Sequence, residues 1–146
     1  MTRKTIDDIV REARGRLGRL EPGQARAAQD EGALLVDTRS SDARRQDGVI
    51  PGSLHIPLSV LEWRLDPAAD PAFHNPHIHG LRQQLVLVCA HGYSSSLAAA
   101  RLQELGFSRA TDLVGGFAAW RDAGLLVCAA ADADGMPGMG DPDPSS

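Results

Sequence analysis

The sequence predicts an α/β fold with a central, mostly parallel sheet of about five strands flanked by helices. Three observations predict it. Short apolar runs alternate with helical patterns, turn residues separate them, and a length of 146 residues suits one domain. Hydrophobic residues make up 42% of the chain and charged residues 23%, which is enough for a buried core beneath a charged surface.

Two helices are predicted before the first strand. Residues 5–20 carry apolar side chains at spacings of three and four, and Thr5 is placed to cap the first turn. Residues 22–30 form the second helix, because a proline suits the first helical turn and Gly32 suits a C-terminal stop. We expect the arginines of the first helix to form a solvated basic face. They are Arg11, Arg14, Arg16 and Arg19.

Four mostly apolar runs are predicted to be strands, with helices in the intervals between them. Unbroken apolar character over a few residues is typical of a strand that is buried on both faces of a parallel sheet. The strands are expected at residues 33–37, 54–56, 84–88 and 111–114, and the helices at 40–46, 58–65, 95–105 and 117–123. Residues 66–80 contain three prolines and three histidines and are expected to form an excursion at the surface.

The composition changes towards the C-terminal end of the chain. Residues 129–146 consist mainly of Ala, Asp, Gly, Pro and Ser, a composition that cannot offset the entropy lost on ordering. We therefore expect a disordered C-terminal tail over residues 129–146. Residues 1–19 are expected to be an N-terminal helical extension, which leaves residues 20–128 as the main domain.

Charge, apolar runs and cysteine usage exclude several classes of protein. A formal net charge of -4 argues against nucleic-acid binding through general phosphate attraction. The sequence has no apolar stretch of the roughly 18–20 residues that a membrane span needs, and its first residues lack the apolar region of a signal peptide. Two cysteines, Cys89 and Cys128, are too few for a disulfide scaffold. We therefore expect a cytoplasmic protein with no nucleic-acid or membrane partner.

Cys89 is the candidate nucleophile. It ends the clearest predicted strand, and a short loop with Gly92 and then a helix start follow it. In open α/β sheets ligands bind beyond the carboxyl ends of the strands, where loop and helix N–H groups stabilise negative charge. A thiolate there has a lowered pKa, and Ser94 and Ser95 could add hydroxyl donors. The alternative interpretation is a buried structural thiol, which is the interpretation that we favour for Cys128.

Other polar and aromatic residues have a structural and a functional interpretation. Asp37 and Arg39 could contact substrate, but we interpret them as a local backbone cap and an ion pair. His91 either tunes the site or points to solvent. Phe117 and Trp120 are predicted to lie in the core rather than to form a ligand platform.

Three histidines lie close together within residues 66–80 and suggest a metal site. A proline interrupts any shared helical face, however, and no cysteine or carboxylate joins the histidines locally. We therefore expect a solvated loop and no metal. The three are His74, His77 and His79.

Four motifs, in order along the chain, resemble those of the rhodanese-domain sulfurtransferases. The loop Cys89-Ala90-His91-Gly92-Tyr93-Ser94-Ser95 is similar to the active-site loop of this family, in the paired-serine variant of some single-domain bacterial thiosulfate sulfurtransferases. Residues 35–39 (LVDTR) resemble its early strand-and-turn motif, residues 48–57 (GVIPGSLHIP) its G-x-I-P-G-A-x-x-I-P element, and residues 113–120 (LVGGFAAW) its closing L-x-G-G-x-x-A-W. The resemblance covers roughly residues 20–127.

The resemblance implies a rhodanese-like fold and sulfur transfer. Cys89 would take a sulfane sulfur from thiosulfate or another persulfide donor, hold it as a persulfide, and pass it to a thiophilic acceptor such as cyanide or a thiol. The partners would be the small-molecule donor and acceptor, or a protein thiol or low-molecular-weight thiol as acceptor, and no cofactor is implied. N–H groups of the loop would hold the persulfide and the departing sulfite. The implied substrate-binding residues are Ala90, His91, Gly92, Tyr93, Ser94 and Ser95.

The loop departs from the family pattern because it contains no arginine or lysine. Ser94 stands where many members have an arginine that attracts thiosulfate, so we expect thiosulfate to be a modest substrate. The loop also resembles the Cys-x5-Arg loop of phosphatases, but Ser95 takes the place of the arginine that binds phosphate. Two alternatives stay open: a non-catalytic sulfur carrier or adaptor that docks through the basic N-terminal helix, and a cysteine phosphatase.

Overall fold

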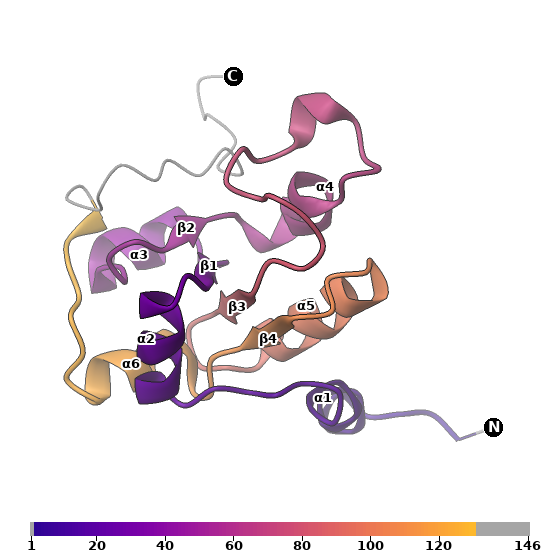
Figure 1. Ribbon diagram of the computed structural model, residues 1–146. Coiled ribbons are helices and arrows are strands. Elements are labelled where there is room, and N and C mark those ends of the chain that lie inside the picture. Colours follow the sequence, from indigo (N-terminus) through magenta and orange to yellow (C-terminus); the bar gives the residue numbers. More distant parts are fainter. Residues whose placement is uncertain (1, 131–146) are drawn as a thin grey trace.

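Four apolar runs pair into one parallel sheet in the computed structural model, which describes residues 2–130 (Figure 1). The sheet order is β2-β1-β3-β4, so β1 and β3 lie at its centre. Asp37 at the end of β1 is level with Val88 at the end of β3, which places Cys89 at the carboxyl edge of the sheet. The strands are β1 (Leu34–Asp37), β2 (Leu54–His55), β3 (Leu85–Val88) and β4 (Ala110–Asp112).

The sheet has four strands within residues 2–130, whereas the sequence predicted about five. Next to β4, a single parallel bridge between Leu20 and Leu113 stands in place of a fifth strand. The Leu20 N–H donates to Asp112 O at 3.1 Å, and the Val114 N–H donates to Leu20 O at 2.9 Å. The pairing stops after Leu20 because Glu21 is already the N-cap of the next helix, which begins at Pro22.

Local sequence signals explain most helix boundaries. Thr5 and Asp8 form a capping box at the start of α1, and Ser40 caps α3. The helix predicted over residues 5–20 ends at Arg14, and Gly15 is its C-cap. The described part of the chain has α1 (Ile6–Arg14), α2 (Pro22–Asp30), α3 (Ser41–Asp47), α4 (Leu61–Leu65), α5 (Ser94–Glu104) and α6 (Gly116–Asp122), with short 3-10 helices at Leu58–Val60 and Pro71–Phe73.

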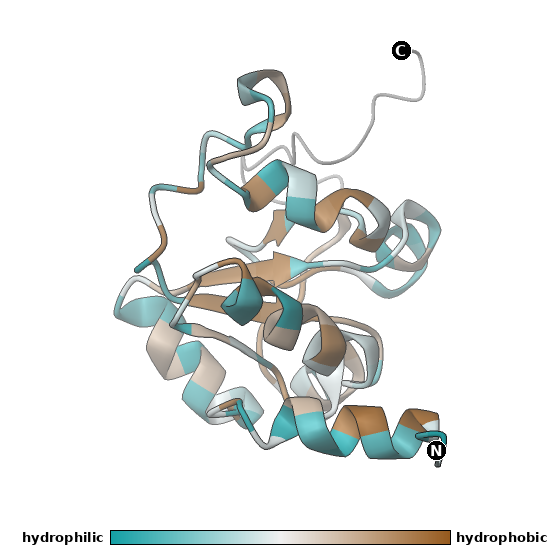
Figure 2. Cartoon of the chain, turned by 90° about the vertical axis from the view of Figure 1, so that its right-hand side faces the viewer, coloured by the Kyte–Doolittle hydropathy of each residue, from teal (hydrophilic) through white to brown (hydrophobic). Residues whose placement is uncertain are grey.

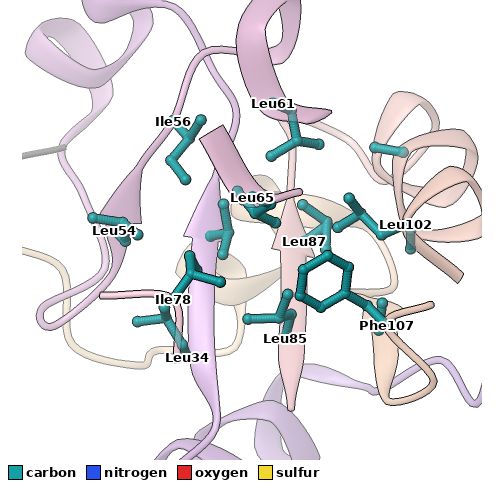
Figure 3. Packing of buried hydrophobic residues seen from close by; sticks show 14 residues of the cluster. Leu34, Leu54, Ile56, Leu61, Leu65, Ile78, Leu85, Leu87, Leu102 and Phe107 are labelled. Carbon is teal, nitrogen blue, oxygen red and sulfur yellow. The ribbon is translucent and has the colours of Figure 1, made fainter. Parts of the chain in front are cut away.

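The helices cover both faces of the sheet, because strand side chains alternate between two hydrophobic clusters. On one face, Leu85 and Leu87 of β3 pack against Leu61 of α4 and Leu102 of α5 (Figure 3). On the other face, Val86 and Val88 pack with residues of α2 and α6, among them Ala25, Phe117 and Trp120. Figure 2 shows the hydrophobic strands between these helical layers.

The excursion at residues 66–80 is largely exposed, as the sequence predicted, but two of its residues are buried. Ile78 is 4% exposed and packs in the cluster of Figure 3, and Asn75 is fully buried. Within residues 2–130, no group of three His, Cys, Asp or Glu side chains is placed to hold a metal ion. Asn75 and Ile78, the two buried residues, hold the excursion against the domain.

The C-terminal tail predicted over residues 129–146 lies outside the described residues, apart from Ala129 and Ala130. Cys128, just before it, pairs with Val49 in an antiparallel bridge, with N–O distances of 2.8 and 3.0 Å. None of the helices in residues 2–130 is both long enough and apolar enough to span a bilayer. The last described residues are thus joined to the domain through Val49.

Candidate active site

Two backbone N–H groups converge on the sulfur of Cys89. The Gly92 N–H donates to Cys89 Sγ at 3.1 Å, and the Ser95 N–H donates to it at 3.4 Å. Ser95 lies in the first turn of α5, where N–H groups have no partner within the helix. Cys89 is 7% exposed, so its side chain is almost completely buried at the carboxyl edge of the sheet. The predicted gathering of amide hydrogens around this thiol is therefore present.

Gly92 and Gly116 bring the loop against the turn before α6. Gly92 has φ +85°, and a Cβ on it would lie 2.7 Å from the backbone nitrogen of Gly115. Gly116 has φ +63°, and its Cβ would lie 2.4 Å from the carbonyl oxygen of Cys89. A side chain at either position is excluded by conformation and by space. The paired glycines of residues 113–120 thus fix the shape of the cysteine loop.

The first N–H groups of α6 take the carbonyl side of the same loop. The Phe117 N–H donates to Cys89 O at 2.8 Å, and the Ala118 N–H donates to Ala90 O at 3.1 Å. These bonds use N–H groups that a helix start leaves without an internal partner. The loop therefore presents carbonyl groups to α6 and N–H groups to the sulfur.

The surroundings of Cys89 favour its thiolate. Burial raises the pKa of the thiol, but hydrogen bonds from the side chains of Ser95 and Ser94, and from the backbone N–H groups of Ser95 and Gly92, lower it by more. The pKa of Cys89 is therefore below its ordinary value of 9.0. A larger fraction of this cysteine is ionised at neutral pH than of an ordinary one.

A buried carboxylate lies behind the loop and binds its serines. Asp112, at the end of β4, is fully buried, and its Oδ2 lies 2.8 Å from Ser95 Oγ and 2.7 Å from Ser96 Oγ. The Arg19 guanidinium neutralises this carboxylate through bonds of 2.8 Å to Oδ1 and 3.2 Å to Oδ2. The Ser95 hydroxyl has one proton, so it donates either to Asp112 or to the sulfur, but not to both at once.

The expectation of a fully solvated basic face on the N-terminal helix is wrong for two of its four arginines. Arg14 and Arg19 are half-buried, and the Nη2 atoms of both donate to Gly92 O, at 2.8 and 3.1 Å. Arg11 and Arg16 are exposed, as expected. One signal was available for Arg14: it lies four residues after the buried Val10 and so shares its helix face.

The remaining loop residues differ in their exposure to solvent. Ala90, His91 and Tyr93 are exposed, whereas Ser94 is half-buried. All seven residues of the predicted loop, 89–95, thus lie together at the carboxyl end of β3. The Tyr93 ring is 63% exposed and lies beneath the Arg14 guanidinium, at 5.4 Å. Cys128 is half-buried and forms no disulfide.

Asp37 and Arg39 have the structural roles expected from the sequence. The Asp37 carboxylate accepts the backbone N–H of Arg39 at 3.0 Å and binds the Arg39 guanidinium at two points, 3.0 and 2.8 Å. That guanidinium stacks 3.8 Å from the ring of Phe117. Phe117 and Trp120 lie in the core, as predicted. This buried pair therefore supports the element that holds the carbonyl groups of the loop.

The sequence is similar to those of known proteins. Residues 21–123 match the family model of the rhodanese-like domain. The thiosulfate sulfurtransferase GlpE of Pseudomonas savastanoi pv. phaseolicola is 37% identical over 103 residues, 70% of this chain and 86% of that protein. GlpE of Pseudomonas paraeruginosa is 40% identical over 104 residues, 70% and 83% of the two chains.

Two solved structures show the same likeness. The human single-domain sulfurtransferase TSTD1 has a TM-score of 0.60 and 30% identity, covering 71% of this chain and 95% of that one. A Rhodopseudomonas palustris protein described as of unknown function and a possible tyrosine phosphatase has a TM-score of 0.73 and 32% identity, covering 87% and 96%. With its glycine-shaped cysteine loop over a parallel sheet, the chain belongs to the rhodanese-like domain family.

Proposed function

We propose that this protein is a sulfurtransferase that moves a sulfane sulfur from thiosulfate, or from another persulfide donor, to a thiophilic acceptor. The observation that carries the proposal is the pair of N–H groups, of Gly92 and Ser95, directed at a cysteine with a lowered pKa. The GlpE relatives, at 36–40% identity over 70% of this chain, are named for the same activity.

The reaction proceeds by two displacements at sulfur. The Cys89 thiolate attacks the outer sulfur of thiosulfate, an S–S bond forms, and the S–S bond of thiosulfate breaks, so that its electron pair leaves with sulfite. Cyanide or a thiolate then attacks the outer sulfur of the persulfide, and the electron pair of that S–S bond returns to Cys89. No external oxidant or reductant is needed.

The loop N–H groups stabilise negative charge throughout this cycle. Each intermediate places an anionic sulfur at the mouth of the loop, where residues 90–95 bind substrate through their backbone. Backbone donors carry no full charge, and the loop itself has no arginine or lysine. We therefore propose that thiosulfate is a modest donor and that a persulfide, on a small thiol or on a protein, is a candidate donor in the cell. Two free thiols, Cys89 and Cys128, fit a reducing cytoplasm.

Intact-mass spectrometry after exposure to thiosulfate tests the proposal. We expect the protein to gain the mass of one sulfur atom and to lose it on treatment with cyanide or a thiol reductant. Cys89→Ser is expected to abolish the gain, whereas the matched control Cys128→Ser keeps it. If neither thiosulfate nor a low-molecular-weight persulfide adds sulfur to Cys89, the proposal is refuted.

A sulfur carrier without turnover is the first alternative. Such a protein would show the Cys89 persulfide in the mass spectrum but no steady production of thiocyanate from thiosulfate and cyanide. A Cys89-dependent rate of thiocyanate formation supports the enzyme over the carrier.

A cysteine phosphatase is the second alternative, and the description of the Rhodopseudomonas palustris protein suggests it. The loop argues against it, because Ser95 occupies the position of the phosphate-binding arginine and its hydroxyl lies against Asp112. We expect no hydrolysis of an aryl phosphate above the level of Cys89→Ser.

A further inference from the structure

We propose that Arg14 and Arg19, in the segment before the family-matched residues, are positioning residues for the cysteine loop: they hold the Gly92 carbonyl and so keep the loop N–H groups directed at Cys89. This inference rests on the proposed sulfur transfer and adds the N-terminal segment to the machinery of that site. The family match begins only at residue 21, so both arginines lie outside it.

The two guanidinium groups share one carbonyl oxygen. Arg14 Nη2 lies 2.8 Å and Arg19 Nη2 3.1 Å from Gly92 O. A carbonyl oxygen has two lone pairs, so the arginines can satisfy it fully. Hydrogen bonds from a charged donor are roughly twice as strong as neutral ones, so this carbonyl is held more firmly than an ordinary loop carbonyl.

Holding the Gly92 carbonyl fixes the peptide unit between Gly92 and Tyr93. This unit lies between the two N–H groups that donate to the Cys89 sulfur. The Gly92 carbonyl and the Tyr93 N–H belong to one trans peptide, and they point in opposite directions. The Tyr93 N–H therefore points away from the arginines. This peptide lies between the Gly92 and Ser95 N–H groups, which reach Cys89 Sγ at 3.1 and 3.4 Å. If it rotated, the chain joining the two donors would move.

The arginines are themselves held by other elements of the domain. Arg19 binds Asp112 of β4 at both carboxylate oxygens, and Arg14 Nε donates to Ser96 Oγ of α5 at 3.2 Å. The helix α1 that carries Arg14 packs against α5, whose first residues belong to the loop (Figure 1). Each arginine therefore has one contact that fixes its direction and one that it gives to the loop.

The arginines also supply the positive charge that the loop lacks. The Arg19 guanidinium pairs with the carboxylate of Asp112, and the Arg14 guanidinium shares the Gly92 carbonyl with it. The other ionisable side chains of residues 89–95, those of His91 and Tyr93, are exposed. Arg14 has directional contacts with both Gly92 O and Ser96 Oγ, so the role proposed for it is geometric as well as electrostatic.

Arg14 is the better arginine to test, because replacing Arg19 would leave the buried Asp112 without its ion pair. The variants are Arg14→Gln, Arg14→Lys and the matched control Arg16→Gln, which removes an exposed arginine two residues away. All are made in a Cys128→Ser background, so that only one thiol reacts. The lysine keeps the charge and has three N–H donors on one atom, but it lacks the planar fork of the guanidinium that reaches Gly92 O and Ser96 Oγ from two separate nitrogens.

Two measurements are made on each variant. The pH dependence of alkylation by iodoacetamide gives the pKa of Cys89 without any sulfur substrate, and the thiosulfate and cyanide assay gives kcat and KM. We expect Arg14→Gln to raise the pKa of Cys89 and to lower kcat/KM about tenfold, the size of one lost charge-assisted hydrogen bond. Arg14→Lys is expected to recover less than half of that loss, and Arg16→Gln to match the parent.

Two outcomes overturn the inference. One is an Arg14→Gln protein with the thiol pKa and kcat/KM of Arg16→Gln. The other is an Arg14→Lys protein that regains the parent values in full, because the two-nitrogen geometry of the guanidinium would then have no part in the effect. If the protein does not transfer sulfur, the parent itself shows no activity in the thiosulfate and cyanide assay. The alkylation measurement then still shows whether Arg14 changes the pKa of Cys89.

Discussion

Replacing the buried Asp112 by asparagine is expected to destabilise the fold strongly. The Asp112 side chain is fully buried, and it accepts hydrogen bonds from Arg19, Ser95 and Ser96. Asp112→Asn removes the negative charge and leaves the Arg19 guanidinium, 16% exposed, without its counter-charge. Breaking a buried ion pair from one side costs about 3–5 kcal/mol, a large part of the roughly 5–15 kcal/mol that holds a typical domain folded.

The matched control is Asp30→Asn. Asp30 pairs with Arg26 at 2.7 Å, but the two side chains are 60% and 47% exposed, so this pair contributes only about 0.3–0.5 kcal/mol. Urea unfolding followed by circular dichroism gives both changes in the free energy of unfolding. Equal losses in the two variants would refute the reasoning, because burial would then have no bearing on what the ion pair contributes.

Two further predictions concern the cysteine loop. The pKa of Cys89 is lower in the folded protein than its ordinary value of 9.0. Its thiolate therefore stabilises the fold fully above pH 9.0, and this contribution decreases as the pH is lowered and vanishes below the folded-state pKa. The difference in unfolding free energy between the parent and Cys89→Ser should therefore grow as pH rises, and a constant difference would contradict it. Gly92→Ala places a Cβ 2.7 Å from the Gly115 nitrogen at φ +85°, and should cost about 2–5 kcal/mol in a thermal melt. Gly18→Ala, with nothing within 4 Å of its Cβ, should leave the melting temperature nearly unchanged, and similar melts for both would contradict the steric argument.

The strands and the cysteine loop could be predicted because their signals are local. Each run is recognised from three to five neighbouring residues, and β3 ends directly before Cys89, as the sequence predicted. The second helix was predicted with both of its ends, since Pro22 and Gly32 mark them. Such elements are specified by residues that are close together in the sequence.

The contacts behind the loop could not be predicted in this way. Arg14 and Gly92 are 78 residues apart, and Arg19 and Asp112 are 93 apart. Nothing near Asp112 in the sequence indicates that two serines and an arginine meet it, because the parallel sheet brings those segments together. The sequence predicted about five strands but placed only four; next to β4, Leu20 forms a single bridge, and the helix that begins at Pro22 follows it closely.

The hydrogen bonds to the Cys89 sulfur come from the peptide backbone of Gly92 and Ser95, so a side-chain replacement cannot delete them directly. The exposed side chains of Ala90, His91 and Tyr93 donate none of these backbone hydrogen bonds. A substitution at one of these three positions therefore leaves both backbone donors to the sulfur in place.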